Sequence, residues 1–512
     1  MLVKDIQPGF LGSSPVFMGV VNEKLIFSAF DGTHGGEPWV SDGTEAGTVM
    51  LQDILDPGVS SSPLEGINYN GHLYFFAHSD NSYEDDLWRT DGTIAGTEHF
   101  LNVLPGEGDI QFNTGGRGVL HLFGGYLYFL DAHPTLEDVC ALWRTDGTAQ
   151  GTEMLSGELD VSRSLTPLGS YADHLYFSVP QLFGGEVLCR IDLGGTIDTV
   201  FALNSFGASI RYPTGAANGL YFIGEDQANG RELYWTDGTT AGTHMVSSFT
   251  GSGPTGFSHN YDHSWFHLAG DTLLFAASDS TLGRALWRSD GTVAGTHLVK
   301  DLVPGSSSGT PISFFAIGAQ VYFATIPDDS SSIYTTDGTE AGTTPLFSME
   351  GLEFLGVNGD ALMLLGNDPR ELYLSHGGVN DTVRITAPGD GAACCDNVSS
   401  AMPALGGYFL SAYVEELGEE LFFYGEDVGI DPQSQARGYS VYPVPADDRL
   451  TVDVEASTTA RIRIHNAVGV NVLGPQILMP TKGVDVSALP PGVYIITVEA
   501  EGEKWSQRFI KQ

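Results

Sequence analysis

Residues 86–97 read Asp86-Leu-Trp-Arg-Thr-Asp-Gly-Thr-Ile-Ala-Gly-Thr97, and this twelve-residue pattern recurs along residues 1–430. A second clear copy spans residues 37–48, and further copies occupy residues 141–152, 232–243, 285–296 and 332–343, with worn copies at 187–196 and 371–382. A short apolar run precedes each copy, as in Leu73-Tyr-Phe-Phe-Ala77. The phenylalanines of these runs recur at intervals of 45 residues (Phe177 to Phe222) to 54 residues (Phe75 to Phe129). A fixed period of this size predicts a repeat architecture.

Each unit is expected to contain four antiparallel strands. The apolar run is continuous rather than alternating, which is typical of a strand covered on both faces. The Glu-Leu-Trp part predicts the third strand, and the Asp-Gly-Thr-x-x-Gly-Thr part predicts a hairpin into a fourth strand such as Thr48-Val-Met-Leu-Gln-Asp-Ile54. In this hairpin we expect Asp42 to accept hydrogen bonds from the backbone that follows it, and Gly43 and Gly47 to adopt positive φ.

Two sets of residues are expected to build the repeat. The turn set consists of Asp42, Gly43, Thr44, Asp91, Gly92, Asp146, Gly147, Asp237, Gly238, Asp290, Gly291, Asp337 and Gly338. The aromatic set, which we expect to fill the space between neighbouring sheets, consists of Trp39, Trp88, Trp143, Tyr234, Trp287 and Tyr334. Because the aspartates recur in most units, we interpret them as turn formers rather than catalysts, since catalysis needs one asymmetric site.

Four antiparallel strands at this spacing predict an all-β chain with a β-propeller of eight or nine four-stranded blades over residues 1–430. A blade has two apolar faces and buries them against its neighbours. The last unit ends at Glu420-Leu-Phe-Phe-Tyr-Gly-Glu-Asp427 and lacks a fourth strand, whereas Leu2-Val-Lys-Asp-Ile6 matches Leu298-Val-Lys-Asp-Leu302, which is a fourth strand. The N-terminal segment is therefore predicted to complete the last blade.

The repeat resembles that of the ELWxxDGT repeat proteins, a family of secreted bacterial β-propellers, and the resemblance covers about residues 1–430. Departures from the pattern are Cys189 in the Trp place, Leu193-Gly194-Gly195 in the Asp-Gly-Thr part, and His376 in the Asp place. Altered turns are expected there. The resemblance implies a secreted propeller, and it supplies no catalytic residue and no ligand.

The repeat stops after residue 430. Residues 431–439 are polar and are expected to form a linker, and residues 440–512 contain short alternating segments that predict a small β-sandwich. This segment resembles the type A sorting domain of the type IX secretion system of Bacteroidota. The matching positions are Tyr442, Pro443, Pro445, Gly469, Leu489, Gly492, Tyr494 and Lys511.

The second resemblance implies a partner and a destination. The type IX secretion machinery is expected to handle the C-terminal domain, and the propeller is expected to lie outside the cell or on the outer cell surface. Export by this route requires an N-terminal signal peptide, and Met1-Leu-Val-Lys-Asp-Ile-Gln-Pro has no apolar region of that kind. We therefore expect that the natural start is missing or that the start codon is misplaced.

The composition excludes several classes of function. The chain has 512 residues, and subtracting 22 Lys+Arg from 64 Asp+Glu gives a net charge of −42. A surface this acidic repels phosphate backbones and anionic lipids, so nucleic acid is not an expected partner. No apolar run is long enough for a transmembrane helix. The four cysteines, Cys140, Cys189, Cys394 and Cys395, are expected to be buried, with one disulfide at most.

Two segments contain several side chains of the types that bind metals. His259, His263 and His267 are four residues apart, which on a strand separates them by about 13 Å, too far to share a zinc ion. Asp80-Asn-Ser-Tyr-Glu-Asp-Asp86 offers oxygen donors but lacks the glycine of an EF-hand loop. Ca²⁺ is left open as a cofactor because of the acidic loops, and no other cofactor is expected. The sequence contains no HExxH, GxSxG or Walker motif.

The leading hypothesis is a non-enzymatic module for surface interaction or adhesion whose ligand is a glycan or a protein. The alternative is a hydrolase or lyase that acts on extracellular polysaccharide in the propeller funnel. This alternative predicts that the insertions at Gly106–Gly118 and Gly251–His263 converge on one cleft with two carboxylates and an aromatic platform.

Overall fold

The computed structural model spans residues 1–512, and every regular element that it describes is a β-strand. The residues it describes are 2–511 without 56–57, 65, 80–84, 101–119, 133–139, 156–168, 182–183, 248–265, 280–281, 304–308, 318–319, 327–330, 350–352, 359–360, 367–371, 376–381, 385–397, 406, 415–416, 426–438, 443–448, 455–459, 467–470, 479–481, 488, 490–491 and 501–502. Within these residues no helix is long and apolar enough to cross a membrane. The predicted linker at 431–439 lies outside them except for Tyr439.

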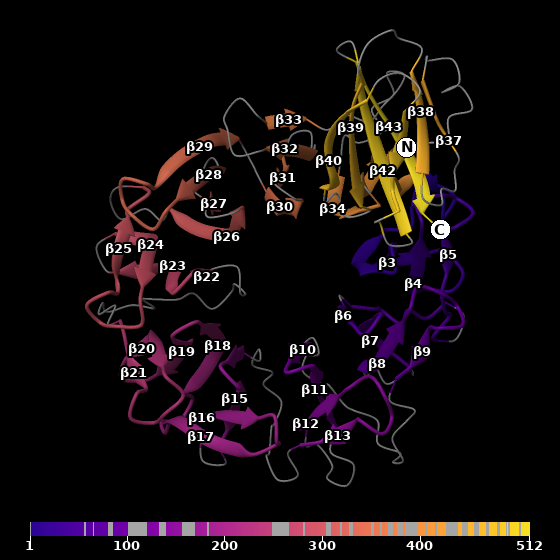
Figure 1. The fold of residues 1–512 in the computed structure, drawn as a ribbon. Coiled ribbons are helices and arrows are strands. Elements are labelled where there is room, and N and C mark those ends of the chain that lie inside the picture. The colour runs from indigo at the N-terminus through magenta and orange to yellow at the C-terminus, as the bar shows by residue number, and fades with distance from the viewer. Residues whose placement is uncertain are drawn as a thin grey trace. The chain divides into compact units, whose positions relative to one another are not determined.

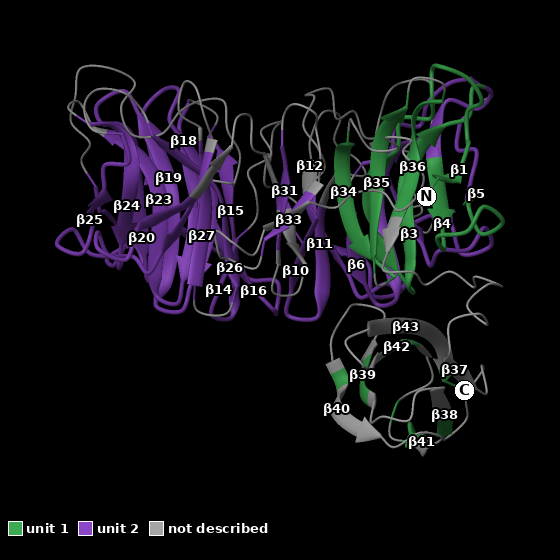
Figure 2. Ribbon diagram, turned by 90° about the horizontal axis from the view of Figure 1, so that it is seen from above, with its two compact units in different colours: residues 1–32, 38–50, 387–512 green, residues 33–37, 51–386 purple. Residues whose placement is uncertain are grey.

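The chain divides into two compact units, which Figure 2 distinguishes by colour. Unit 1 consists of residues 1–32, 38–50 and 387–512, and unit 2 consists of residues 33–37 and 51–386. Each unit is described by itself.

Unit 2 contains seven four-stranded antiparallel sheets among its described residues. The first three are β6 (Ile67–Tyr69), β7 (His72–His78), β8 (Asp85–Thr90) and β9 (Glu98–His99); β10 (Leu120–Phe123), β11 (Tyr126–Ala132), β12 (Cys140–Thr145) and β13 (Glu153–Met154); and β14 (Gly169–Tyr171), β15 (His174–Pro180), β16 (Glu186–Asp192) and β17 (Ile197–Leu203). The fourth and fifth are β18 (Ser209–Ala216), β19 (Gly219–Asp226), β20 (Gly230–Thr236) and β21 (His244–Met245); and β22 (Phe266–Ala269), β23 (Thr272–Asp279), β24 (Gly283–Ser289) and β25 (His297–Lys300). The last two are β26 (Thr310–Ile317), β27 (Gln320–Ile326), β28 (Ser331–Thr336) and β29 (Thr344–Met349); and β30 (Glu353–Asn358), β31 (Ala361–Leu365), β32 (Leu372–Ser375) and β33 (Thr382–Arg384).

The second strand of each sheet is the apolar run of the repeat, and its two faces are buried against different neighbours. β7, for example, buries five successive residues from Leu73 to Ala77. Tyr74 shares a buried cluster with Phe129 of the following sheet. The same relation links Tyr128 to Phe177, Tyr176 to Phe222, Tyr221 to Phe275 and Leu274 to Phe323. The continuous apolar run is thus explained, and the predicted strand covered on both faces is confirmed.

Within unit 2 the sheets follow one another along an arc, with strands such as β17, β21 and β25 on its outer side (Figure 1). This is the arrangement of propeller blades. The weakest copy of the repeat also forms a regular sheet, from β30 to β33. Each fully buried phenylalanine contributes about 1.5–3 kcal/mol to folding, so the packing of sheet on sheet supplies the main stabilisation.

Unit 1 contains the first and the last blade. The first consists of β2 (Val16–Val21), β3 (Lys24–Phe30), β4 (Gly36–Ser41) and β5 (Val49–Met50), although β4 begins in unit 2. The last consists of β34 (Val398–Ala404), β35 (Gly407–Val414), β36 (Gly418–Gly425) and β1 (Leu2–Lys4). The described residues before 430 therefore form nine four-stranded sheets, the higher of the two predicted numbers.

The N-terminal strand completes the last blade, as predicted. β1 pairs antiparallel with β36, with Leu2 opposite Phe422 and Lys4 opposite Leu421. Behind this pairing, Val3 and Ile6 share a buried cluster with Phe27 and Phe409, which belong to the first and last blades.

Four of the fourth strands are shorter than the predicted segment Thr48–Ile54. β5, β9, β13 and β21 are two residues long. A further backbone bond follows after a break, as in the donation from Leu155 N to the carbonyl of Leu142 at 2.8 Å. These four are edge strands with one partner, and only a short part of each keeps the ladder register, whereas the fourth strands β17 and β29 are seven and six residues long.

Two further sheets form the C-terminal sandwich. One contains β37 (Tyr439–Tyr442), β38 (Arg449–Val454) and β41 (Lys482–Asp485), and the other contains β40 (Asn471–Leu478), β39 (Ala460–Asn466), β42 (Gly492–Ala500) and β43 (Glu503–Lys511). Leu450 and Val484 of the first sheet and Ile462, Ile464 and Ile496 of the second are fully buried. The predicted β-sandwich is confirmed.

Candidate functional site

The repeated turns have one geometry. In each of six turns the Oδ1 atom of the aspartate accepts two hydrogen bonds from the threonine two residues later. The backbone N–H donates at 2.8–3.0 Å and the hydroxyl at 2.6–2.7 Å, and the six pairs are Asp42 and Thr44, Asp91 and Thr93, Asp146 and Thr148, Asp237 and Thr239, Asp290 and Thr292, and Asp337 and Thr339. These bonds favour the ionised carboxylate and lower the pKa of Asp91, Asp146, Asp237, Asp290 and Asp337.

The two glycines of each turn have different roles. The one directly after the aspartate has a positive φ of 82–89°, as at Gly43 and Gly147. The expected positive φ at Gly47 is wrong, because this residue does not lie in the left-handed region. A Cβ at Gly47, or at the equivalent Gly151, would instead fall well under 3.0 Å from the carboxylate of the same turn. The second glycine is therefore required by the close approach of the aspartate.

Gly151→Ala is expected to reduce the stability of its blade by about 1–3 kcal/mol, because the new methyl group forces the Asp146 carboxylate out of the turn. The midpoint of thermal unfolding measures the loss. Asp146→Ala removes the obstructing group, so the double variant should lose less than the sum of the two single variants. Strictly additive losses would contradict the steric explanation.

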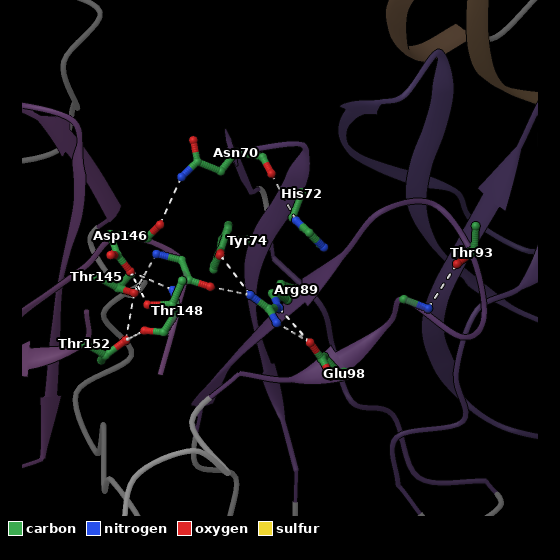
Figure 3. Close-up of polar contacts among 12 residues, drawn as sticks. Asn70, His72, Tyr74, Arg89, Thr93, Glu98, Thr145, Asp146, Thr148 and Thr152 are labelled. Atoms are coloured by element: carbon green, nitrogen blue, oxygen red, sulfur yellow. Dashed lines mark hydrogen bonds and ion pairs between the residues drawn. The ribbon is translucent and has the colours of Figure 1, made fainter. Parts of the chain in front are cut away.

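Four of the turns are also held by an arginine of the preceding blade, as Figure 3 shows for the turn at Asp146. Arg89 Nη1 donates to the carbonyl of Gly147 at 2.8 Å, and Asn70 Nδ2 donates to the carbonyl of Asp146 at 3.0 Å. Arg89 is oriented by an ion pair with Glu98. The same contact recurs from Arg144 to the carbonyl of Leu193, from Arg190 to that of Gly238 and from Arg288 to that of Gly338, at 2.7–3.2 Å. The turns thus act as joints between blades.

Lysine makes the corresponding contact from the fourth strand. Lys300 of β25 donates to the carbonyl of Thr343, the last residue of the next repeat, at 2.6 Å. Lys4 of β1 donates in the same way to the carbonyl of Thr48 at 2.7 Å. The match between residues 2–6 and 298–302 therefore extends to the hydrogen bonds that these segments make.

The aromatic set lies mainly in the buried clusters. Trp39, Trp143 and Tyr234 are buried in clusters that contain residues of two neighbouring sheets. Trp287 and Tyr334 are partly buried against such clusters, and Tyr334 stacks on Phe323 at 5.4 Å between ring centroids. Trp88 is half-buried, donates to Ser79 Oγ at 2.9 Å and lies against His99 of its own sheet.

Sequence reasoning missed a set of buried glutamates at the first position of the repeat. Glu37 is fully buried, and its carboxylate accepts bonds from Ile54 N at 3.0 Å, Ser61 N at 2.9 Å and the Ser61 hydroxyl at 2.7 Å. It thereby holds the connection that leads from β5 to β6. Burial raises the pKa of Glu37 despite these bonds. Glu232 at the same position accepts a bond from Ser247 at 2.9 Å, and Glu186, one residue before the first position of its copy, accepts one from Ser178 at 2.9 Å.

Glu420 has the same role where the N-terminal segment joins the last blade. Its carboxylate accepts bonds from Ile6 N and Gln7 N, both at 3.2 Å, and from the Ser13 hydroxyl at 2.6 Å. Burial raises its pKa. The signal that could have revealed this set is an acidic residue within a strand, directly before its apolar positions, because such a residue is buried only with partners.

The two kinds of carboxyl group predict a stability maximum in weak acid. Turn aspartates such as Asp146 and Asp237 have pKa values below 3.8, so their contribution is present above that pH and is lost as the pH falls through their folded pKa values. Glu37 and Glu420 have pKa values above 4.5, so their contribution is fully present below that pH and is lost as the pH rises through their folded pKa values. The midpoint of thermal unfolding should therefore rise from neutral pH to about pH 4–5 and fall at lower pH. A midpoint that rises steadily to neutral pH would contradict this.

The candidates for other chemistry do not form a site in the described residues. His267 lies in β22, stacks on Phe314, and has a pKa lowered by burial, whereas His259 and His263 lie outside the described residues. So do residues 80–84 of the acidic segment, both long insertions, Cys394, Cys395 and His376. No cluster of three or more metal-ligating side chains is found in the described part of the chain. Cys189 is a free, buried thiol, and burial raises its pKa to about 11.

The altered turn after Cys189 is tighter than the others. Thr196 N donates to Asp192 Oδ1 at 2.8 Å, and Gly195 has a φ of 87°. The carbonyl of Leu193 still receives Arg144 of the preceding blade.

The structure brings some of the sorting-domain positions together. Gly492 lies opposite Lys511 in the pairing of β42 with β43, and the side chains of Leu489, Tyr494 and Lys511 are buried. Tyr442 ends β37, opposite Thr451. Pro443, Pro445 and Gly469 lie outside the described residues.

Comparisons with known proteins identify the C-terminal domain. The family model of the secretion system C-terminal sorting domain matches residues 440–512. This domain indicates export by the type IX secretion system, and the protein is secreted to the cell surface or the extracellular space. No curated protein matches the chain.

Among solved structures, the chain is similar to a prolyl endopeptidase studied for inter-domain dynamics, with 12% identity, a TM-score of 0.42, and coverage of 78% of this chain and 55% of that one. It is also similar to apo prolyl oligopeptidase B from Galerina marginata, with 12% identity, a TM-score of 0.38, and coverage of 78% and 56%. A third similar structure is that of puromycin hydrolase, with 13% identity, a TM-score of 0.37, and coverage of 70% of this chain and 59% of that one. The chain spans little more than half the length of these proteins.

Proposed function

We propose that the protein is a secreted β-propeller of the ELWxxDGT repeat type that serves as a non-enzymatic interaction or adhesion module. The C-terminal sandwich engages the type IX secretion machinery, and the propeller presents a binding surface to a glycan or a protein outside the cell. The match of residues 440–512 to the sorting domain supports the extracellular setting.

The observation that carries the proposal is the structural use of the repeated carboxylates. In each turn, for example at Asp146, one carboxylate oxygen accepts two hydrogen bonds from Thr148 of the same turn. The adjacent Gly147 carbonyl is bonded to Arg89 of the preceding blade. The most abundant polar motif of the chain is therefore committed to stability, and it supports a scaffold role better than a catalytic one.

The test is a glycan and protein array probed with the purified full-length chain, with and without Ca²⁺. Retention of one class of ligand, with the ligand recovered chemically unchanged, is the expected result. Shortening of a bound polysaccharide, seen by size-exclusion chromatography of the recovered sugar, would replace the proposal with the hydrolase or lyase alternative. Loss of binding on addition of a chelator would assign Ca²⁺ a role.

A further inference from the structure

Five large apolar side chains are exposed near one end of the first and last blades. Phe10 is 75% exposed, Leu11 67%, Val16 60%, Tyr413 45% and Phe30 42%. We call these five residues the apolar patch. Single exposed apolar residues are common, whereas a group of this kind marks an interaction surface.

The backbone pairing brings the members of the patch together. Val16 lies opposite Ser28 in the pairing of β2 with β3, and Phe30 is two residues further along the same face of β3. Phe30 N donates to the carbonyl of Ser13 at 2.9 Å, which places the end of β3 beside the loop that carries Phe10 and Leu11.

Tyr413 joins the group through the last blade. It lies opposite Glu419 in the pairing of β35 with β36. The carbonyl of Glu419 accepts bonds from Ser13 N at 2.8 Å and Ser14 N at 2.9 Å. Gly12 forms a β-bridge with Glu419, so Tyr413 is next to the same loop.

The loop is fixed in place while it exposes its apolar residues. Gly12 has a φ of 66°, and a Cβ there would fall under 3.0 Å from the Glu419 backbone, so the two backbones touch. Glu420 holds the preceding residues Ile6 and Gln7. An ordered loop loses little conformational entropy on binding, which favours its use as a preorganised docking surface.

The equivalent loop of the next blade makes similar contacts without two large exposed apolar side chains. Glu37 holds Ile54 and Ser61 as Glu420 holds Ile6 and Ser13. The positive φ of Ser14 also has its counterpart, at Ser62. Gly58 and Val59 stand where the first loop has Phe10 and Leu11. The contacts that the two loops share therefore do not require the exposed pair Phe10 and Leu11.

The charges near the patch have one sign. Asp31 follows Phe30 directly, and Glu419 lies opposite Tyr413. In residues 2–50 and the described part of 398–425 the cationic side chains Lys and Arg are limited to Lys4 and Lys24. Lys24 begins β3, which Phe30 ends, and Lys4 is bonded to the carbonyl of Thr48.

We propose that the apolar patch docks a cationic protein segment with apolar anchor residues. The proposal rests on the interaction role proposed above and assigns it a surface and a partner class. Anionic lipid and a second copy of this chain carry the same charge sign as the protein and are repelled. A glycan requires several hydrogen-bonding side chains, whereas four of the five patch residues have none. A cationic segment complements the carboxylates, and its apolar residues cover the patch.

The experiment measures fluorescence anisotropy of three labelled peptides of equal length with the full-length chain. One combines Lys with Phe and Leu, one combines Lys with Ser and Gly, and one combines Glu with Phe and Leu. The first peptide is expected to bind at least about tenfold more tightly than the other two. In the double variant Phe10→Ser/Leu11→Ser the affinity for the first peptide should fall by about tenfold or more. Added salt should weaken this binding further.

The matched control is Phe206→Ser, because Phe206 is 77% exposed in the equivalent connection between β17 and β18. This control should bind the peptide of Lys, Phe and Leu as tightly as the wild type does. Equal binding of the Lys-Ser-Gly peptide, an equal loss in the control, or an unchanged double variant would each overturn the proposal. Preferential binding of neutral lipid vesicles, or self-association that the double variant abolishes, would assign the patch to another occupant and overturn it as well.

Failure of this inference differs from failure of the proposed function. If the double variant keeps the array ligand of the wild type and binds all peptides alike, the docking surface is refuted and the interaction role stands. If no array ligand binds while the peptide results hold, the patch is a docking surface and the glycan arm of the proposed function fails. Both variants replace exposed side chains, and equal unfolding midpoints would show that they fold.

Discussion

Deletion of residues 1–6 is expected to lower the free energy of unfolding by about 4–8 kcal/mol. Val3 and Ile6 are buried against the first and last blades, and each contributes about 1.5–3 kcal/mol by leaving water. The deletion also removes one of the two partners of β36 and the hydrogen bond that Ile6 N donates to Glu420. Chemical unfolding followed by tryptophan fluorescence measures the loss, and hydrogen exchange should increase in Gly418–Gly425.

The control restores the strand without a covalent link. A synthetic peptide with the sequence of residues 1–8 should bind the truncated chain and recover part of the lost stability, and a scrambled peptide should not. A truncated chain that unfolds within about 1 kcal/mol of the intact one would contradict a structural role for β1.

Glu420→Ala is expected to cost about 3–5 kcal/mol, because it leaves three buried donors without an acceptor. These donors are Ile6 N, Gln7 N and the Ser13 hydroxyl. The matched control is Glu419→Ala at the neighbouring position, where the half-buried carboxylate accepts bonds from the hydroxyls of Ser399 and Ser411. The control should lose about 1 kcal/mol.

Glu420→Gln separates hydrogen bonding from charge. It keeps one acceptor oxygen and should lose less stability than Glu420→Ala. It also removes a group with a raised pKa, so stability should decline less between about pH 5 and neutral pH than in the wild type. Equal losses for the alanine variants at 419 and 420 would show that the buried carboxylate does not hold the N-terminal segment.

The parts of the fold that repeat could be predicted from the sequence. The Leu-Tyr-Phe runs predict a strand buried on two sides, and the structure places Tyr74 and Phe129 in one core between consecutive sheets. The missing strand of the last unit predicts the pairing of β1 with β36. Both predictions follow because each repeat supplies four strands and each sheet must bury its two apolar faces.

Interactions between neighbouring repeats could not be predicted from the sequence in the same way. The contact of Arg89 with the Gly147 carbonyl depends on the angle between two blades, which no single repeat encodes. The role of Gly47 depends on where the Asp42 carboxylate folds back, so its conformation was predicted wrongly. Phe10 and Leu11 occur once, in a loop, and therefore lack the periodic signal by which the core was found.

A cysteine pair tests the closure of the last blade most directly. Leu2→Cys/Phe422→Cys places the two thiols on residues that face each other in the pairing of β1 with β36. After oxidation, peptide mapping by mass spectrometry should find an intrachain link between positions 2 and 422, and the linked protein should unfold at a higher temperature than its reduced form. Absence of this link, or its formation only between separate chains, would contradict the completion of the last blade by the N-terminal strand.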